Sequence, residues 1–286
     1  MPRPVTVGID GSAASLAAAA WAAREAELRD TSLHLIAAWP PPDGHAPEPP
    51  DAIVHRHWAV RSLDLARDRL RGRHPCLDIH ARLLGLPNRE ALLTAGLAAD
   101  LLVLGACGLD ATSPRQLGST GADTAAQAGF PLALVRAVPH PADPPSGPVL
   151  LALDVRTVWD DVIAVAFEEA AMREVPLRAL FAWMSTGPVR PRPITPWPCG
   201  RSPHARHAEQ RLTEALLPWR QKYPDVRVEE VCLEDIPADA VTAATHHAAL
   251  AVLGHRVQAT TGPRLGAVAR AAVHQATCPV LLVPHG

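Results

Sequence analysis

The fold is decided by Asp100-Leu-Leu-Val-Leu-Gly105-Ala-Cys-Gly108-Leu-Asp-Ala-Thr-Ser-Pro-Arg-Gln-Leu-Gly118-Ser119-Thr120, in which an apolar run passes through a glycine-spaced loop into a helical pattern. Glycines let a backbone approach a ligand closely, and the free N–H groups and positive dipole of a helix N-terminus attract an anion. Glycines alone would also suit simple turns. The spacing G-x2-G-x9-G-S between a predicted strand and a predicted helix favours a phosphate-binding loop, with the Ser119 and Thr120 hydroxyls as added donors.

The chain repeats the same order of patterns in its two halves. An offset of 144 residues separates Asp154 from Asp10, and the same offset separates Trp183 from Trp39, each at the end of an apolar run. The later matches, Leu250-Ala-Val-Leu-Gly254 and Pro279-Val-Leu-Leu-Val283, repeat the runs ending at Gly105 and Val135 with slightly larger offsets. Internal repeats of this length indicate one fold used twice.

A proline-rich segment divides the halves. Residues 138–148 hold five prolines in eleven positions, which forbids a helix and disfavours a central strand. We expect a first domain over residues 1–138, a linker over 139–148 and a second domain over 149–286.

Each half alternates short, continuously apolar runs with helical patterns, which predicts an α/β fold with a parallel sheet. Asn88 and Ser119 are predicted as helix N-caps because their side-chain oxygens can accept backbone N–H groups. In the first half we expect strands near 4–9, 32–38, 77–83, 100–104 and 132–137, and helices near 13–29, 52–72, 88–98 and 119–129. In the second half we expect strands near 149–153, 177–183, 226–232, 250–253 and 279–283.

Composition excludes several classes of protein. The 27 basic and 29 acidic residues are spread evenly, which argues against nucleic acid or an anionic membrane as a partner. The only lysine is Lys222, so a P-loop and a Schiff-base enzyme are excluded. Five scattered cysteines, no signal-peptide pattern and no apolar stretch of membrane-spanning length predict a cytoplasmic protein.

The sequence resembles the universal stress protein family. The matching residues are Val7-Gly8-Ile9-Asp10-Gly11-Ser12, Ala37-Ala38-Trp39 and the run from Ala99 to Gly105 that leads into the glycine loop. The resemblance covers nearly the whole chain as a tandem pair. It implies two open parallel five-stranded sheets of order 3-2-1-4-5, with helices on both faces and a ligand crevice where the first and fourth strands part.

The resemblance also implies a ligand, ATP, accompanied by magnesium, and a set of binding residues. Asp10 has an alternative interpretation as the N-cap of the first helix, and the two roles do not exclude each other. The adenine and ribose pocket would be lined by Gly8, Ile9, Asp10 and Ala38, and the phosphates would be surrounded by Gly105, Gly108, Gly118, Ser119 and Thr120.

The second half departs from this pattern in one loop. Val257 replaces the second glycine, eight residues rather than nine precede Gly266, and Ala267 replaces the serine. A valine adopts positive φ only at a cost, and an alanine offers a phosphate no hydroxyl, so the second domain is expected to be structural or to accept a smaller ligand. The histidine pairs of the chain lack the spacing of a zinc site, and no nucleophile elbow is present.

These patterns lead to one hypothesis and one rival. The hypothesis is a regulatory stress-response protein in which ATP occupancy changes a conformation or the surface for an unknown protein partner, with little or no catalysis. The rival is an interaction module of the same fold that binds no nucleotide. The fifth strand of each half is an apolar edge, so we expect the halves to pair as an internal pseudo-dimer, with at most a homodimer formed through other surfaces.

Overall fold

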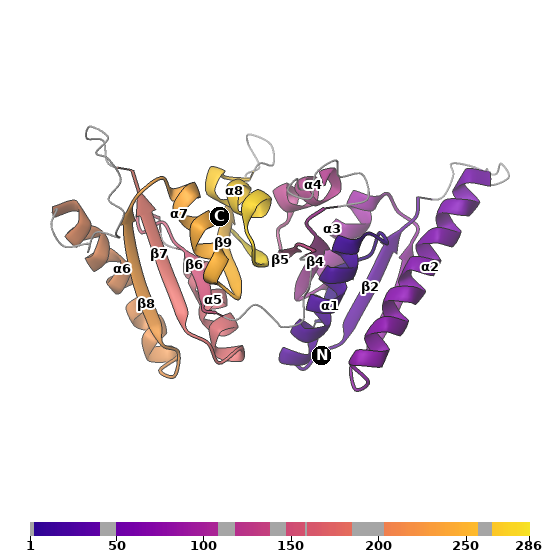
Figure 1. Cartoon of the computed structure of the whole chain (residues 1–286), viewed down its shortest axis with the longest axis horizontal. Helices are drawn as coiled ribbons and strands as arrows, with labels where there is room; N and C mark the ends of the chain where they lie inside the picture. Colours follow the sequence, from indigo (N-terminus) through magenta and orange to yellow (C-terminus); the bar gives the residue numbers. More distant parts are fainter. Residues whose placement is uncertain are drawn as a thin grey trace. The chain divides into compact units, whose positions relative to one another are not determined.

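A computed structural model describes residues 3–40, 50–107, 118–137, 147–157, 159–184, 203–256 and 265–286 of the chain. The chain forms two compact units, one in each half (Figure 1). Each unit is an α/β sandwich in which a parallel sheet lies between helices.

The sheet of the first unit has the strand order β3-β2-β1-β4-β5. The central strand β1 pairs in parallel with β2 on one side, where Val7 lies opposite Leu35, and with β4 on the other, where Val7 lies opposite Val103. The elements are β1 (Val5–Gly8), α1 (Ala13–Leu28), β2 (Leu33–Ala38), α2 (Pro50–Arg73), β3 (Ile79–Leu84), α3 (Asn88–Ala98), β4 (Leu101–Gly105), α4 (Ser119–Gln127) and β5 (Leu132–Val135).

This order places a topological switch point between β1 and β4. The chain moves outward from β1 through β2 to β3, then returns and moves outward in the opposite direction through β4 to β5. Helix α1 packs against α2, and α3 packs against α4, so each pair of crossover helices covers one face of the sheet. The loops after β1 and β4 therefore diverge and leave a crevice at the carboxyl ends of these strands.

The inner strands of both sheets are buried on both faces, which explains their continuously apolar sequences. In the first unit Val5, Val7, Leu102 and Val103 are fully buried, and in the second Leu151 and Val252 are equally buried. Apolar side chains on both sides of a strand are what a parallel sheet between two helical layers requires.

The second unit repeats the architecture with the order β10-β9-β6-β7-β8. Strand β6 pairs in parallel with β7 and β9, as β1 does with β2 and β4. The elements are β6 (Val149–Ala152), α5 (Asp160–Met172), β7 (Leu177–Trp183), α6 (Pro203–Lys222), β8 (Val228–Glu234), α7 (Pro237–Ala244), the 3-10 turn η1 (Thr245–His247), β9 (Leu250–Arg256), α8 (Ala267–Gln275) and β10 (Val280–His285). The predicted fold class and strand order are confirmed for both units.

The predicted helix caps are wrong by one or two residues. Ser12, and not Asp10, is the N-cap of α1, and its hydroxyl accepts the Ser15 N–H at 3.1 Å. Asn88 and Ser119 are the first residues of α3 and α4, preceded by caps that make no side-chain hydrogen bond. Helix starts are often misplaced in this way when several polar residues stand in succession.

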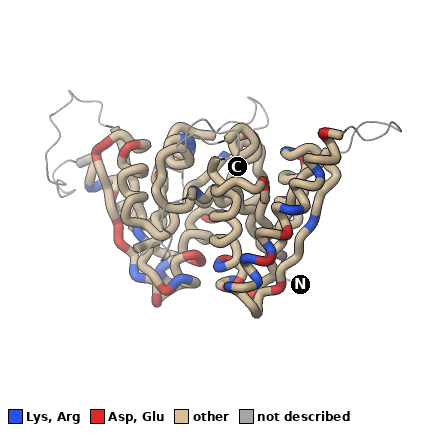
Figure 2. Tube along the Cα trace, turned by 45° about the vertical axis from the view of Figure 1, so that its right-hand side comes forward, with Lys and Arg blue, Asp and Glu red and all other residues tan. Residues whose placement is uncertain are grey.

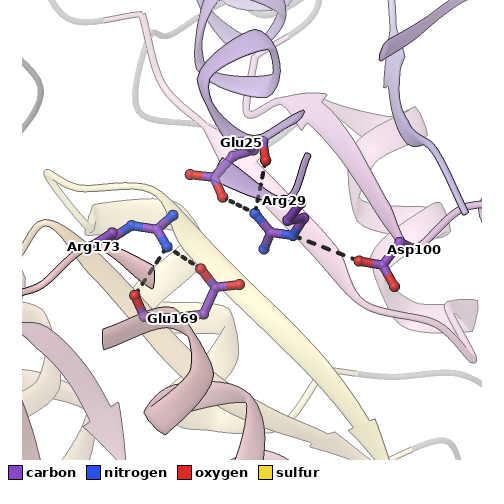
Figure 3. Close-up of polar contacts among 5 residues, drawn as sticks. All are labelled: Glu25, Arg29, Asp100, Glu169 and Arg173. Carbon is purple, nitrogen blue, oxygen red and sulfur yellow. Dashed lines mark hydrogen bonds and ion pairs between the residues drawn. The ribbon is translucent and has the colours of Figure 1, made fainter. Parts of the chain in front are cut away.

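The repeat extends to buried ion pairs at the ends of α1 and α5 (Figure 3). In the first unit Arg29 pairs with the buried Glu25 of the same helix, and its Nε lies 3.6 Å from Asp100 Oδ2. In the second unit Arg173 pairs with the buried Glu169 at the equivalent positions. A buried carboxylate is tolerated when it is paired in this way.

Charged residues of both signs are interspersed along both units (Figure 2). No helix within the described ranges has the length and apolar character needed to span a membrane.

Candidate functional site

The first unit contains a cleft of about 1200 Å³ at the carboxyl ends of β1, β2 and β4. Helices α2, α3 and α4 contribute the remaining walls. The described lining residues are Gly8, Ile9, Asp10, Ser15, Ile36, Ala37, Ala38, Trp39, Pro40, Ala52, Val54, His55, Trp58, Ala59, Pro87, Asn88, Ala91, Leu92, Leu104, Gly105, Gly118, Ser119, Thr120 and Gly121.

The turn after β1 holds Asp10 in a fixed position. The Asp10 Oδ1 atom accepts the Ser12 N–H at 2.9 Å, and the Ser12 hydroxyl in turn caps α1. Gly11 adopts a φ of +80°, a conformation that side chains rarely tolerate, and a Cβ here would lie 2.6 Å from the Trp58 ring. The glycine therefore lets the chain turn and presents the Asp10 carboxylate to the cleft.

The end of β4 lies against the start of α1. A Cβ at Gly105 would lie 2.7 Å from the Ala14 carbonyl carbon and 2.8 Å from the Ser15 nitrogen, both backbone atoms. Since backbone atoms cannot rotate away, Gly105 is required for this close approach. The cleft thereby gains a wall made of main chain.

Helix α4 starts beside the end of β4 and has no side-chain cap. Its N-cap Gly118 is extended, with φ −62° and ψ 152°, and donates its own N–H to the Ala106 carbonyl at 3.1 Å. No side chain caps the N–H groups of the first turn, which begins with Ser119 and Thr120. A helix start of this kind suits an anion such as a phosphate.

Aromatic side chains from α2 and from the residue that follows β2 form a further wall. The Trp39 indole donates its Nε1–H to the Ala52 carbonyl at 3.1 Å, and the Arg56 guanidinium lies over the Trp39 ring. Trp58 and His55 of α2 also line the cleft, and Trp58 is 43% exposed. Sequence reasoning missed the α2 residues. The spacing of Ala52, His55 and Ala59 by three and four residues places them on one helix face, but it does not show that this face meets the cleft.

The structure brings eight of the nine predicted binding residues into this one cleft: Gly8, Ile9, Asp10, Ala38, Gly105, Gly118, Ser119 and Thr120. Gly108 lies outside the described residues. Whether these residues bind a nucleotide stays a prediction. Their convergence from the ends of β1, β2 and β4 and the start of α4 is what the switch-point topology requires.

The second unit retains the aspartate but engages it differently. Asp154 forms an ion pair with Arg156, which takes the position of Ser12, and the two side chains meet through hydrogen bonds of 2.9 and 2.7 Å. The hydrogen bonds from Arg156 lower the pKa of Asp154. This carboxylate is therefore already paired with a cation.

Bulky rings stand at the end of β9 in the second unit. Trp159 takes the position of Ser15 and stacks on His285 with ring centroids 4.5 Å apart. A Cβ at Gly254, the counterpart of Gly105, would lie 2.8 Å from the His285 ring rather than against backbone. Burial, together with Arg256 and His255, lowers the pKa of His285.

The structure describes some of the residues at which the glycine loop of the second unit differs from that of the first. Helix α8 begins at Ala267 after the N-cap Gly266, so the residue at the place of Ser119 has no hydroxyl. Val257 lies outside the described residues. Arg156 and Trp159 lie outside the glycine loop. The second unit therefore differs from the first-unit site at residues beyond this loop as well.

The fold and cleft define the class of protein: a doubly wound α/β protein with a switch-point cleft, present as a tandem pair. The model of the universal stress protein family matches the chain twice, over residues 1–136 and 146–284. The chain belongs to this family.

Relatives and solved structures agree over the whole length. A universal stress protein of Mycobacterium tuberculosis is 32% identical over 295 residues, covering 97% of this chain and 96% of the relative. A second one from the same species is 31% identical over 292 residues, covering 97% and 95%. The crystal structure of a universal stress protein from Archaeoglobus fulgidus has a TM-score of 0.71 and 13% identity, covers 99% of this chain and 98% of that one, and shows the shared fold.

Proposed function

We propose that this protein is a regulatory stress-response protein that binds one ATP molecule in the first-unit cleft and acts through the resulting change in conformation or partner surface. The observation that carries the proposal is that Asp10 and the start of α4, which has no side-chain cap, line the same cleft. A helix start can hold phosphates, while a fixed carboxylate can accept hydrogen bonds from ribose hydroxyls.

The cleft walls suit the rest of such a ligand. Ala38, Leu92 and the aromatic rings of Trp39 and Trp58 give an apolar surface large enough for a flat base. Gly8 and Gly105 keep the strand ends free of side chains, so a sugar can lie against the main chain.

Binding rather than turnover is the proposed activity. Within the described lining, Asp10 is the single carboxylate, and its Oδ1 atom is already held by the Ser12 N–H. A rapid hydrolase needs a group placed to activate or orient the attacking water. We therefore expect any ATP hydrolysis to be slow and incidental.

The experiment that tests the proposal is acid extraction of the purified full-length protein, followed by chromatography of the released nucleotides and calorimetric titration with ATP. Adenine nucleotide in the extract, or saturable binding in the titration, supports it. An empty extract together with no binding up to about 1 mM ATP would instead favour the interaction module that binds no nucleotide.

A further inference from the structure

Two histidines lie side by side on β2 and β3, outside the described lining of the cleft. His34 lies directly opposite His80 in the parallel pair of strands, so both side chains project from the same face of the sheet. Their rings meet edge to face, with centroids 5.1 Å apart. The His80 side chain is 52% exposed, so solvent reaches the pair.

The second unit has an ion pair at the same register positions. Arg178 of β7 lies opposite Glu229 of β8, and its Nη2 atom is 3.0 Å from Glu229 Oε2. Each charge of this pair is matched by the other. Two imidazoles cannot neutralise each other in this way. The first unit therefore carries two nitrogen ligands side by side where the second unit carries a salt bridge.

Asp78 orients the His80 ring. The His80 Nε2 atom lies 2.9 Å from Asp78 Oδ2, and because a carboxylate only accepts hydrogen bonds, the ring nitrogen is the donor. A neutral His80 ring then carries its proton on Nε2 and presents the lone pair of Nδ1. A carboxylate that accepts a hydrogen bond from the second nitrogen is the usual partner of a metal-binding histidine.

The separation of the two rings suits one shared metal ion. Imidazoles that bind zinc through one nitrogen each, at about 2.0 to 2.1 Å and with a tetrahedral angle at the metal, have centroids about 5 Å apart. The observed centroids of His34 and His80 are 5.1 Å apart. Rotation about the Cβ–Cγ bond, which has broad minima, can turn a nitrogen of each ring toward a common point.

The charges around the pair decide which kind of ion it suits. Burial lowers the pKa of His34, His80 and Arg82 lower it further, and Asp78 raises it. One cationic and one anionic side chain thus act on the pair, and their formal charges cancel. Attraction must therefore come from the imidazole nitrogens, which favour zinc, copper and nickel over the oxygen-seeking magnesium and calcium.

We propose that His34 and His80 form a surface site for one borderline transition-metal ion, such as Zn²⁺, with Asp78 positioning the His80 ring. The two imidazoles supply the protein ligands, and water completes the coordination. No group of three metal-ligating side chains exists among the described residues. The ion is therefore exchangeable, unlike a structural zinc with four protein ligands. The inference is independent of nucleotide binding in the cleft.

The test is calorimetric titration of the full-length protein with zinc chloride and, separately, with magnesium chloride. The double change His34→Arg with His80→Glu installs the ion pair that the second unit carries at this register. It should weaken the zinc binding of the unaltered protein at least about tenfold, whereas magnesium should give no saturable binding to either protein. The urea unfolding midpoint of each variant shows whether the fold is retained.

A matched control makes the same pair of changes at exposed histidines of the second unit. His246→Arg with His247→Glu removes two imidazoles from η1 and should leave zinc affinity within about twofold of the unaltered value. A second measurement needs no variant. Zinc should slow the modification of His34 and His80 by diethylpyrocarbonate, read by peptide mass mapping, and should leave that of His246 unchanged.

Equal zinc binding by the unaltered protein and the His34→Arg, His80→Glu variant would overturn the proposal. No binding up to about 1 mM zinc would also overturn it. A loss of the same size in the control variant, or protection of His246 equal to that of His34 and His80, would assign the binding to histidines in general and not to this pair.

Discussion

At the scale of single residues, Gly118 and Gly266 can be compared because they cap equivalent helices in the two units. Both are N-caps in extended conformations, with φ of −62° and −59°, so a valine is sterically acceptable to the backbone at either position. Only Gly118 lines the described first-unit cleft. A side chain there would stand between a phosphate and the N–H groups of α4.

We expect Gly118→Val to weaken nucleotide binding at least about a hundredfold while leaving the far-ultraviolet circular dichroism spectrum unchanged. Gly266→Val, the matched change in the second unit, should leave affinity unaltered. Calorimetry on both variants measures this. Equal affinities for the two variants would contradict the phosphate-binding role of the α4 start.

Burial also predicts which thiols react. Burial raises the pKa of Cys278 to about 12, whereas Cys76 is exposed. Because the folded-state pKa lies above the ordinary value of 9.0, the folded state disfavours the thiolate, and stability decreases only as the pH rises above about 9.

We therefore expect iodoacetamide at pH 8 to modify Cys76 and spare Cys278 in the native protein, with both modified in denaturant. Peptide mass mapping reads the two sites separately. Native-state labelling of Cys278 at a rate close to that of Cys76 would show that the segment before β10 opens readily.

At the scale of elements, the sequence predicted the strands better than the site. Runs such as Val5–Gly8 and Leu101–Gly105 are recognisable because both sheet faces are buried, and the strand order was predicted through family resemblance. Trp58 and His55 were missed because helical periodicity in α2 does not reveal which face meets the cleft. Trp159 was missed because its ring stacks on His285, which is distant in sequence.

Two helical glycines test how closely the elements pack. A Cβ at Gly96 of α3 would lie 2.1 Å from the buried Phe130 ring, whereas a Cβ at Gly72 of α2 would meet nothing within 4 Å. Overpacking of this kind typically costs about 1 to 3 kcal/mol, while replacing an exposed helical glycine by alanine gains about 0.5 to 1 kcal/mol.

We expect Gly96→Ala to lower the free energy of unfolding and Gly72→Ala to raise it, both measured by urea titration. The two changes add the same methyl group to a helix of the same unit, so opposite signs isolate packing from helix propensity. A stabilising Gly96→Ala would mean that Phe130 moves aside without cost.

At the scale of the whole molecule, the edge strands of the two sheets affect how the halves of the chain can pair. β5 and β10 are the fifth strands of the two units, and both are apolar. The expected pairing of the halves as a pseudo-dimer stays a prediction. If it is right, the isolated fragment of residues 1–140 should self-associate in light scattering, because an uncovered apolar edge recruits another copy. A monomer at high concentration would count against it.

The duplication preserved the fold and the buried Glu–Arg pairs while the two sites diverged. Arg156 occupies the position of Ser12 and pairs with Asp154, Trp159 replaces Ser15, and Ala267 replaces Ser119. These residues stand on three different elements or turns. A nucleotide in the second unit would therefore have to displace an ion pair and a stacked ring and bind without the serine hydroxyl.

We accordingly expect about one nucleotide per full-length chain. Among the described residues, the first unit alone combines a carboxylate that has no ion pair with an open strand end and hydroxyls at the helix start. Calorimetry gives the stoichiometry directly. Trp159→Ser restores the residue found in the first unit, yet it leaves the Asp154–Arg156 pair and Ala267 in place, so the stoichiometry should not change. Two equivalent sites in the unaltered protein would show that neither the pair nor the stacked rings prevent binding.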